Sequence, residues 1–120
     1  MAGIGGTLIS RGNVLSRGII APSLTPVEVA ASTAAEQAFT ISGLAIGDFV
    51  EVNYFGTNDT TPAAQTAGLG IVNARVSAAN TLRICFSNST AGALTPAAGI
   101  YHMAVSRAEA PMSELTENCA

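Results

Sequence analysis

The clearest structural signal lies in three runs: GLAIGDFVEVN (residues 43–53), AGLGIVNARVSAANTLRICFSNSTAG (residues 67–92) and PAAGIYHMAVSR (residues 96–107). Each run is rich in β-branched or aromatic residues that alternate with polar or small ones. Gly, Pro, Asn or Ser punctuates the runs. This pattern predicts short antiparallel strands joined by tight turns.

Alternation also predicts which side chains face a core. The segment 30–38 is interpreted as turn and strand, because Thr33 and the flanking β-branched runs argue against a helix. Phe49 and Phe55 are expected on the opposite face of their strand. Their presence there predicts that this face too is partly covered. The expected core-facing side chains are Val50, Val52, Tyr54, Leu82, Ile84, Phe86, Tyr101, Met103 and Val105. The sequence therefore predicts an all-β fold, a small antiparallel β-sandwich or barrel of jelly-roll type.

Three segments are expected along the chain: an extended N-terminal arm (residues 1–25), a β-sandwich domain (residues 26–107) and a short acidic C-terminal tail (residues 108–120). The first 27 residues contain two arginines and no acid, whereas the tail contains three glutamates and no base. Residues 18–20 are a candidate edge strand within the arm. Residues 56–68 are expected to form a long polar surface loop.

Composition argues against two classes of partner. The chain of 120 residues has a net charge of −3 and contains no lysine, so it has few cations with which to neutralise nucleic-acid phosphates. No apolar run approaches the ~20 residues that a membrane-spanning helix needs. Charged residues make up 11% and aromatic residues 5% of the chain, so we expect a thin core and a surface partly covered by a partner.

No catalytic or metal site is expected, and therefore no enzyme activity and no cofactor. His102 is the sole histidine and lies in mid-strand without a recognisable nucleophile partner. Cys85 and Cys119 are interpreted as free thiols, with an intermolecular link through Cys119 as the alternative. Asp48 is expected to cap its own turn and Glu51 to lie on an outer strand face, so they do not suggest a catalytic carboxylate pair.

Residues 33–107 resemble small β modules found in tailed-bacteriophage virion proteins. The resemblance is carried by AAEQAFTISGLAIGDFVEVN (residues 34–53), AGLGIVNARVSAANTLRICFSNSTAGAL (residues 67–94) and PAAGIYHMAVSR (residues 96–107). In those modules a Thr- and Ala-rich entry leads to a Gly-x-x-x-Gly-Asp turn and a Val-rich strand. An AGL loop, a VSAANT turn and an Arg-containing strand follow before the last strand. The segment 56–68 is longer here than in that pattern.

As a stand-alone chain, such a module implies a capsid decoration or cement protein on the virion surface, assembled in the cytoplasm of the host bacterium. The implied partners are the major capsid protein and other copies of the chain, a trimer being favoured over a dimer. Within a longer chain, it implies a receptor- or carbohydrate-binding fibre module, here through Tyr54, Tyr101 and residues 56–68. A third interpretation is a bacterial β-sandwich adaptor with no viral link. For the first, the expected capsid or subunit contacts are Ile4, Leu8, Ile9, Arg11, Val14, Leu15, Arg17, Ile19 and Ile20.

Overall fold

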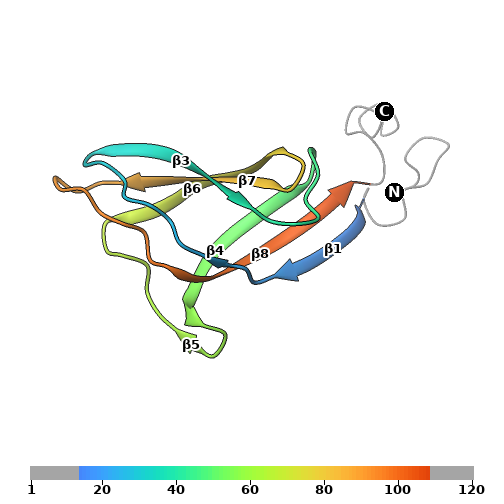
Figure 1. Cartoon of the computed structure of the whole chain (residues 1–120), viewed down its shortest axis with the longest axis horizontal. Helices are drawn as coiled ribbons and strands as arrows, with labels where there is room; N and C mark the ends of the chain where they lie inside the picture. Colours follow the sequence, from blue (N-terminus) through green and yellow to red (C-terminus); the bar gives the residue numbers. More distant parts are fainter. Residues whose placement is uncertain (1–13, 109–120) are drawn as a thin grey trace, which may run out of the picture.

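Two antiparallel β-sheets pack face to face in the structure, a computed structural model that describes residues 14–108 (Figure 1). No helix occurs in this part of the chain. The predicted all-β antiparallel sandwich is thus confirmed. Because the two sheets are separate, the molecule is a sandwich and not a closed barrel.

The larger sheet is organised around the last strand of the described chain. It contains β1 (Val14–Ile20), β2 (Ser23–Leu24), β4 (Phe49–Asn58), β5 (Thr61–Pro62) and β8 (Gly99–Ala108). The order is β1-β8-β4-β5, and β2 pairs with β8 on the same side as β1. We call it the β8 sheet. Its register places Val14 opposite Ala108, so the two ends of the described chain lie side by side.

The smaller sheet, called the β7 sheet, contains β3 (Thr33–Thr40), β6 (Leu69–Ala78) and β7 (Thr81–Asn88) in the order β3-β7-β6. The predicted hairpin between β6 and β7 is confirmed. Asn80 turns the chain with a φ of 59°, a left-handed conformation that Asn tolerates better than most residues. Its side-chain oxygen accepts a hydrogen bond from the Gly43 N–H (2.8 Å), and its own N–H donates to the Leu44 carbonyl (2.9 Å). These bonds join the hairpin to the turn that leads into β4.

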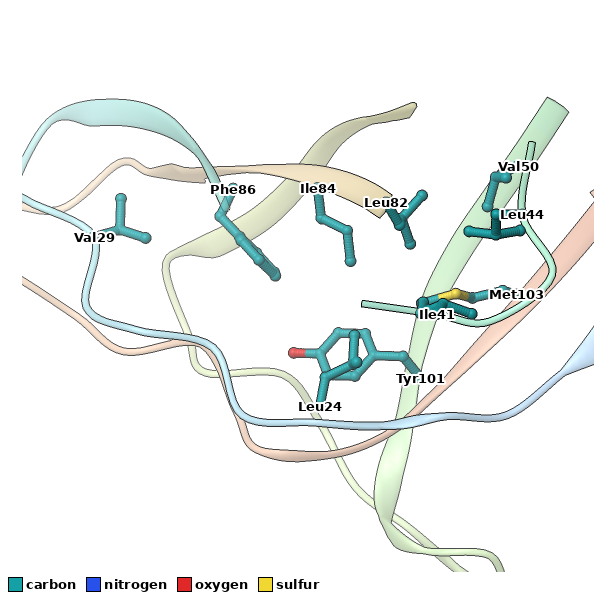
Figure 2. Packing of buried hydrophobic residues seen from close by; sticks show 10 residues of the cluster. All are labelled: Leu24, Val29, Ile41, Leu44, Val50, Leu82, Ile84, Phe86, Tyr101 and Met103. Carbon is teal, nitrogen blue, oxygen red and sulfur yellow. The ribbon is translucent and has the colours of Figure 1, made fainter. Parts of the chain in front are cut away.

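The core lies between the two sheets. Leu82, Ile84 and Phe86 of β7 are fully buried, as are Tyr101 and Met103 of β8. Figure 2 shows these side chains directed into the space between the two sheets. The predicted alternation is confirmed in β4, β7 and β8. The remaining predicted core residues are buried or pack against this cluster: Val50, Val52, Tyr54 and Val105.

Two predicted boundaries differ from the structure. Residues 14–24 were expected to belong to an arm, with residues 18–20 as a candidate edge strand; the edge strand is confirmed, and it is longer than expected, because residues 14–20 form β1, residues 23–24 form β2 and both pair with β8. Leu24 is buried in the core and Ile20 packs against it, so burial of apolar side chains holds this segment in the sandwich. Residues 1–13 and 109–120, the rest of the expected arm and tail, lie outside the described residues.

The segment 56–68 is not wholly a loop. β4 continues to Asn58 and folds back into β5, with Gly56 opposite Pro62 and Asn58 opposite Thr61. A Cβ atom at Gly56 would overlap the backbone of Thr61 and Pro62. Glycine therefore permits a close approach of the two chains, which polar composition alone did not reveal.

Candidate contact surface

Within residues 14–108, the most buried charged group is the Asp48 carboxylate, whose side chain is 1% exposed. The Arg107 Nε and Nη2 donate to its two oxygens at 2.8 Å each, and the Ala45 N–H donates at 3.0 Å. The hydrogen bond from Arg107 is the main reason why the pKa of Asp48 lies below its ordinary value, although burial acts in the opposite direction. Arg107 also donates to the Gly43 carbonyl (2.8 Å). The predicted capping role of Asp48 is confirmed, and Arg107 additionally fixes this turn to β8.

Tyr101 and Tyr54 contribute to the core. Tyr101 is 0% exposed, and its ring centroid lies 5.0 Å from that of Tyr54 and 6.5 Å from that of Phe86. The Tyr101 hydroxyl donates to the Ala97 carbonyl (2.7 Å) and accepts from Gln65 Nε2 (3.0 Å). Burial raises the pKa of this hydroxyl. The fibre-module alternative used Tyr101 as a binding residue, but its burial leaves no ring surface for a receptor or sugar.

Among the described residues, the other ionisable side chains form one further ion pair, between Glu36 and Arg75. Within residues 14–108, no group of three His, Cys, Asp or Glu side chains is placed to hold a metal ion. His102 is exposed and stacks on Phe55, with ring centroids 4.4 Å apart. Glu36 is bonded by Arg75 at 2.7 Å across the β7 sheet. Exposed apolar side chains are consequently the most distinctive feature of the described surface.

Three large apolar side chains are exposed on β1 and at the start of β4, two strands away in the same sheet. The exposed fractions are 52% for Leu15, 70% for Ile19 and 59% for Phe49, which was expected to be partly covered. The register aligns Ile19 with Ala104 of β8 and Arg17 with Ser106, which in turn lies opposite Phe49 of β4. Ile19, Arg17 and Phe49 alternate with core-facing residues and therefore lie on the outer face of the β8 sheet. We call Leu15, Arg17, Ile19 and Phe49 the β1 surface.

β1 is also an edge of its sheet. It pairs with β8 on one side, and no described strand pairs with its other side. Such an edge leaves backbone N–H and C=O groups open to another strand, unless charges, prolines or bulges protect it. A bulge lies between Val14 and Ser16, and Arg17 is the one charged residue of β1. The adjoining residues 18–20 carry neither form of protection.

The outer strands of the β7 sheet are better protected. β6 has two bulges, one between Ile71 and Asn73 and one between Val76 and Ala78. Beside β3, the Gln37 side chain exchanges two hydrogen bonds with the backbone of Val27, at 2.7 and 2.8 Å. Of the edge strands β1, β3 and β6, β1 is therefore the most open to pairing.

The predicted contact residues separate into two groups. Ile4, Leu8, Ile9 and Arg11 lie outside the described residues and stay predictions. The others lie in β1, where Leu15, Arg17 and Ile19 are exposed and Ile20 packs against the core. Sequence reasoning missed Phe49 as a neighbour, because its place near Arg17 depends on the strand order. The members of the second group are Val14, Leu15, Arg17, Ile19 and Ile20.

Comparison of the chain with protein-family models, with curated proteins and with solved structures found no match. Among the described residues there is no helix of the length and apolar character needed to cross a membrane.

Proposed function

We propose that this chain is a structural protein of a tailed-bacteriophage virion, which binds the outer surface of the capsid and stabilises the head. The resemblance of residues 33–107 to virion β modules supports the viral setting. The main support for a capsid contact at β1 is its open edge, on a strand that also exposes Leu15 and Ile19. The proposed partners are the major capsid protein and further copies of the chain, a trimer being favoured over a dimer.

An open strand edge suits the binding of an extended segment of another protein. Main-chain hydrogen bonds supply affinity in this mode, and alternate side chains supply specificity. Single exposed apolar residues are common on protein surfaces, but neighbouring ones indicate a contact site. In this proposal β1 pairs with a strand or arm of the capsid protein. Ile19, on the edge strand itself, then loses part of its exposure to water.

Binding to purified heads tests the proposal. The double variant L15S/I19S removes two exposed apolar side chains from the contact and leaves the core residues of β1 in place. Full burial of one such side chain contributes about 1.5–3 kcal/mol. We therefore expect the affinity for heads that lack this protein to fall at least about tenfold, which corresponds to 1.4 kcal/mol. Co-sedimentation with the heads measures the bound fraction.

The matched control is Val72→Ser, because Val72 is 63% exposed but lies on β6 of the other sheet. It should bind heads as the unaltered protein does. Equal binding by L15S/I19S, with an unchanged circular dichroism spectrum, would exclude β1 as the contact. Deleting residues 1–22 is a poorer test, because the deletion removes β1 and also Pro22, whose carbonyl accepts a hydrogen bond from the Tyr101 N–H (3.0 Å).

The fibre-module alternative predicts a different result. A receptor- or carbohydrate-binding module should bind a glycan array or host cells, whereas a decoration protein should bind neither. Because Tyr101 is buried, the aromatic pair nearest the solvent on the β8 sheet is the half-buried Phe55 stacked on the exposed His102. Glycan binding that is lost in Phe55→Ser, together with no binding to heads, would favour the alternative.

A further inference from the structure

Six side chains on the outer face of the β8 sheet form two rows across β1, β8 and β4. The register aligns one row through Ser106 of β8 and the next row through Ala104. Alternation along the strands places both rows on the face that points away from the core. We call these residues the outer array: Arg17, Ser106 and Phe49 in the first row, and Ile19, Ala104 and Glu51 in the second.

The corners of the outer array are exposed, and its middle is small. Phe49 and Ile19 are each more than half exposed, and Arg17 and Glu51 are exposed as well. Within residues 14–108, neither Arg17 nor Glu51 forms an ion pair. A hollow of about 180 Å³ lies between Ile19 and Glu51, over Ala104. The array therefore presents apolar surface, two opposite charges and space for side chains from a partner.

Similar corners of the outer array lie on the same diagonal. One diagonal joins Ile19 with Phe49, and the other joins Arg17 with Glu51. A two-fold axis along the apolar diagonal would lay Arg17 of each copy over Glu51 of the other, and each apolar residue over its own counterpart. An axis along the strands, or across them, would instead place every charge on an apolar side chain. An axis along the charged diagonal would bring like charges together.

We propose that two copies of this chain pack face to face through their outer arrays. Charge complementarity selects the second copy as the partner and the apolar diagonal as the axis. In this arrangement two ion pairs between Arg17 and Glu51 flank the contacts of Ile19 and Phe49. The ion pairs specify the orientation, and burial of the apolar side chains contributes to the affinity.

The geometry of the sheet permits this arrangement. Strands lie about 4.8 Å apart and alternate residues about 6.7 Å apart, so the strands of the two copies would cross at about 110°. A crossing near 90° is one of the two ways in which β-sheets pack face to face. Sheets packed in this way lie about 10 Å apart, a gap that an Arg and a Glu side chain can span together.

The inference does not rest on the proposed capsid function, because it concerns the free protein. It does identify a surface for the further copies proposed above. Two-fold packing joins copies in pairs, whereas the trimer was favoured on the sequence resemblance alone. The contact also leaves the edge of β1 open, because the backbone groups of an edge strand point sideways in the plane of its sheet. A capsid strand can pair there while the second copy covers the outer face.

Charge reversal tests the contact in the full chain. Sedimentation equilibrium from micromolar to millimolar concentrations should show a monomer–dimer equilibrium for the natural protein. Arg17→Glu and Glu51→Arg each place like charges opposite one another at two positions of the pair. Each should therefore weaken the dimer at least about tenfold. The matched control is Glu28→Arg, which makes the same change of charge at an exposed residue between β2 and β3 and should leave the dimer unchanged.

Two recombinations of these changes should restore the dimer. The double variant R17E/E51R has opposite charges on the diagonal again and should dimerise about as strongly as the natural chain. An equimolar mixture of R17E with E51R should form mixed dimers, because one variant has two carboxylates in its array and the other has two guanidinium groups. Neither variant should pair with itself at the concentration used for the mixture. A role of these residues in folding alone does not produce this recovery.

Three results would overturn the proposal. The first is a natural chain that stays monomeric over the whole concentration range. The second is loss of the dimer in the single variants without recovery in the double variant and the mixture. The third is a dimer or trimer that the reversals leave intact, which would place the contact between copies elsewhere without contradicting the capsid function. Both substituted residues are exposed, so the variants should keep the circular dichroism spectrum of the natural chain.

Discussion

Replacing Phe86 with alanine should destabilise the sandwich strongly. Phe86 is 0% exposed on β7, and its ring meets the Tyr101 ring edge-on. Truncation of a buried Phe typically costs about 3–5 kcal/mol, through lost transfer free energy and the cavity left behind. β7 is paired on both sides, with β3 and with β6, so its backbone cannot move inward to close the cavity. We therefore expect a loss in the upper half of that range.

A loss of this size is a large part of the stability of a small domain, about 5–15 kcal/mol in total. The melting temperature should fall by about 16 °C or more, at roughly 4–8 °C per kcal/mol for a domain of this size. Urea titration followed by far-ultraviolet circular dichroism gives the free energy of unfolding. Tyrosine fluorescence provides a second probe, because Tyr101 meets Phe86 and Tyr54 packs against Tyr101.

The matched control is Val72→Ala in the adjacent strand β6, where the side chain is 63% exposed. It should change the free energy of unfolding by no more than about 0.5 kcal/mol. If Phe86→Ala destabilises the protein no more than this control does, the packing described between the two sheets is wrong. Phe86→Leu, which retains most of the volume, should cost less than Phe86→Ala.

Two further predictions concern the turns. The pKa of Asp48 is lowered in the folded protein, so the Arg107–Asp48 pair stabilises the fold above the ordinary Asp value of 3.8, and this contribution is lost as the pH falls below it. Urea midpoints measured against pH should show this acid loss in the natural chain and a smaller one in Asp48→Asn; equal pH dependence would contradict the assignment. Gly56→Ala should destabilise the protein by about 1–3 kcal/mol through overlap with the β5 backbone, whereas Gly92→Ala, in open space, should melt close to the natural chain.

Local alternation was sufficient to predict the faces of most strands. In β7 and β8 every second residue is large and apolar, and that period specifies a half-buried strand whichever neighbour it has. The β6–β7 hairpin was also predictable, because Asn80 is a residue that accepts the left-handed turn conformation. The capping role of Asp48 was predictable for a similar local reason, because this residue lies in a Gly-Asp turn.

Strand neighbours could not be predicted in the same way. β1 was assigned to an arm because its sequence, VLSRGII, has little alternation, and its partner β8 lies more than 80 residues further along the chain. Arg107 gave no local sign that it would bond Asp48, since the two residues meet only when β4 and β8 pair. The β1 surface was missed in part for the same reason. Its apolar members come from β1 and β4, which are separated by β8.

The central place of β8 has a consequence for the order of folding during synthesis. β3, β6 and β7 are complete once residue 88 has left the ribosome, and the β6–β7 hairpin is a local contact that forms rapidly. The β8 sheet cannot form until residues 99–108 have been synthesised, because β1, β2 and β4 each pair with β8. Until then their apolar faces are unpaired in the nascent chain, which is the period of greatest risk of aggregation. A delay in the synthesis of β8 should therefore reduce the yield of folded protein more than an equal delay in the synthesis of the β6–β7 hairpin.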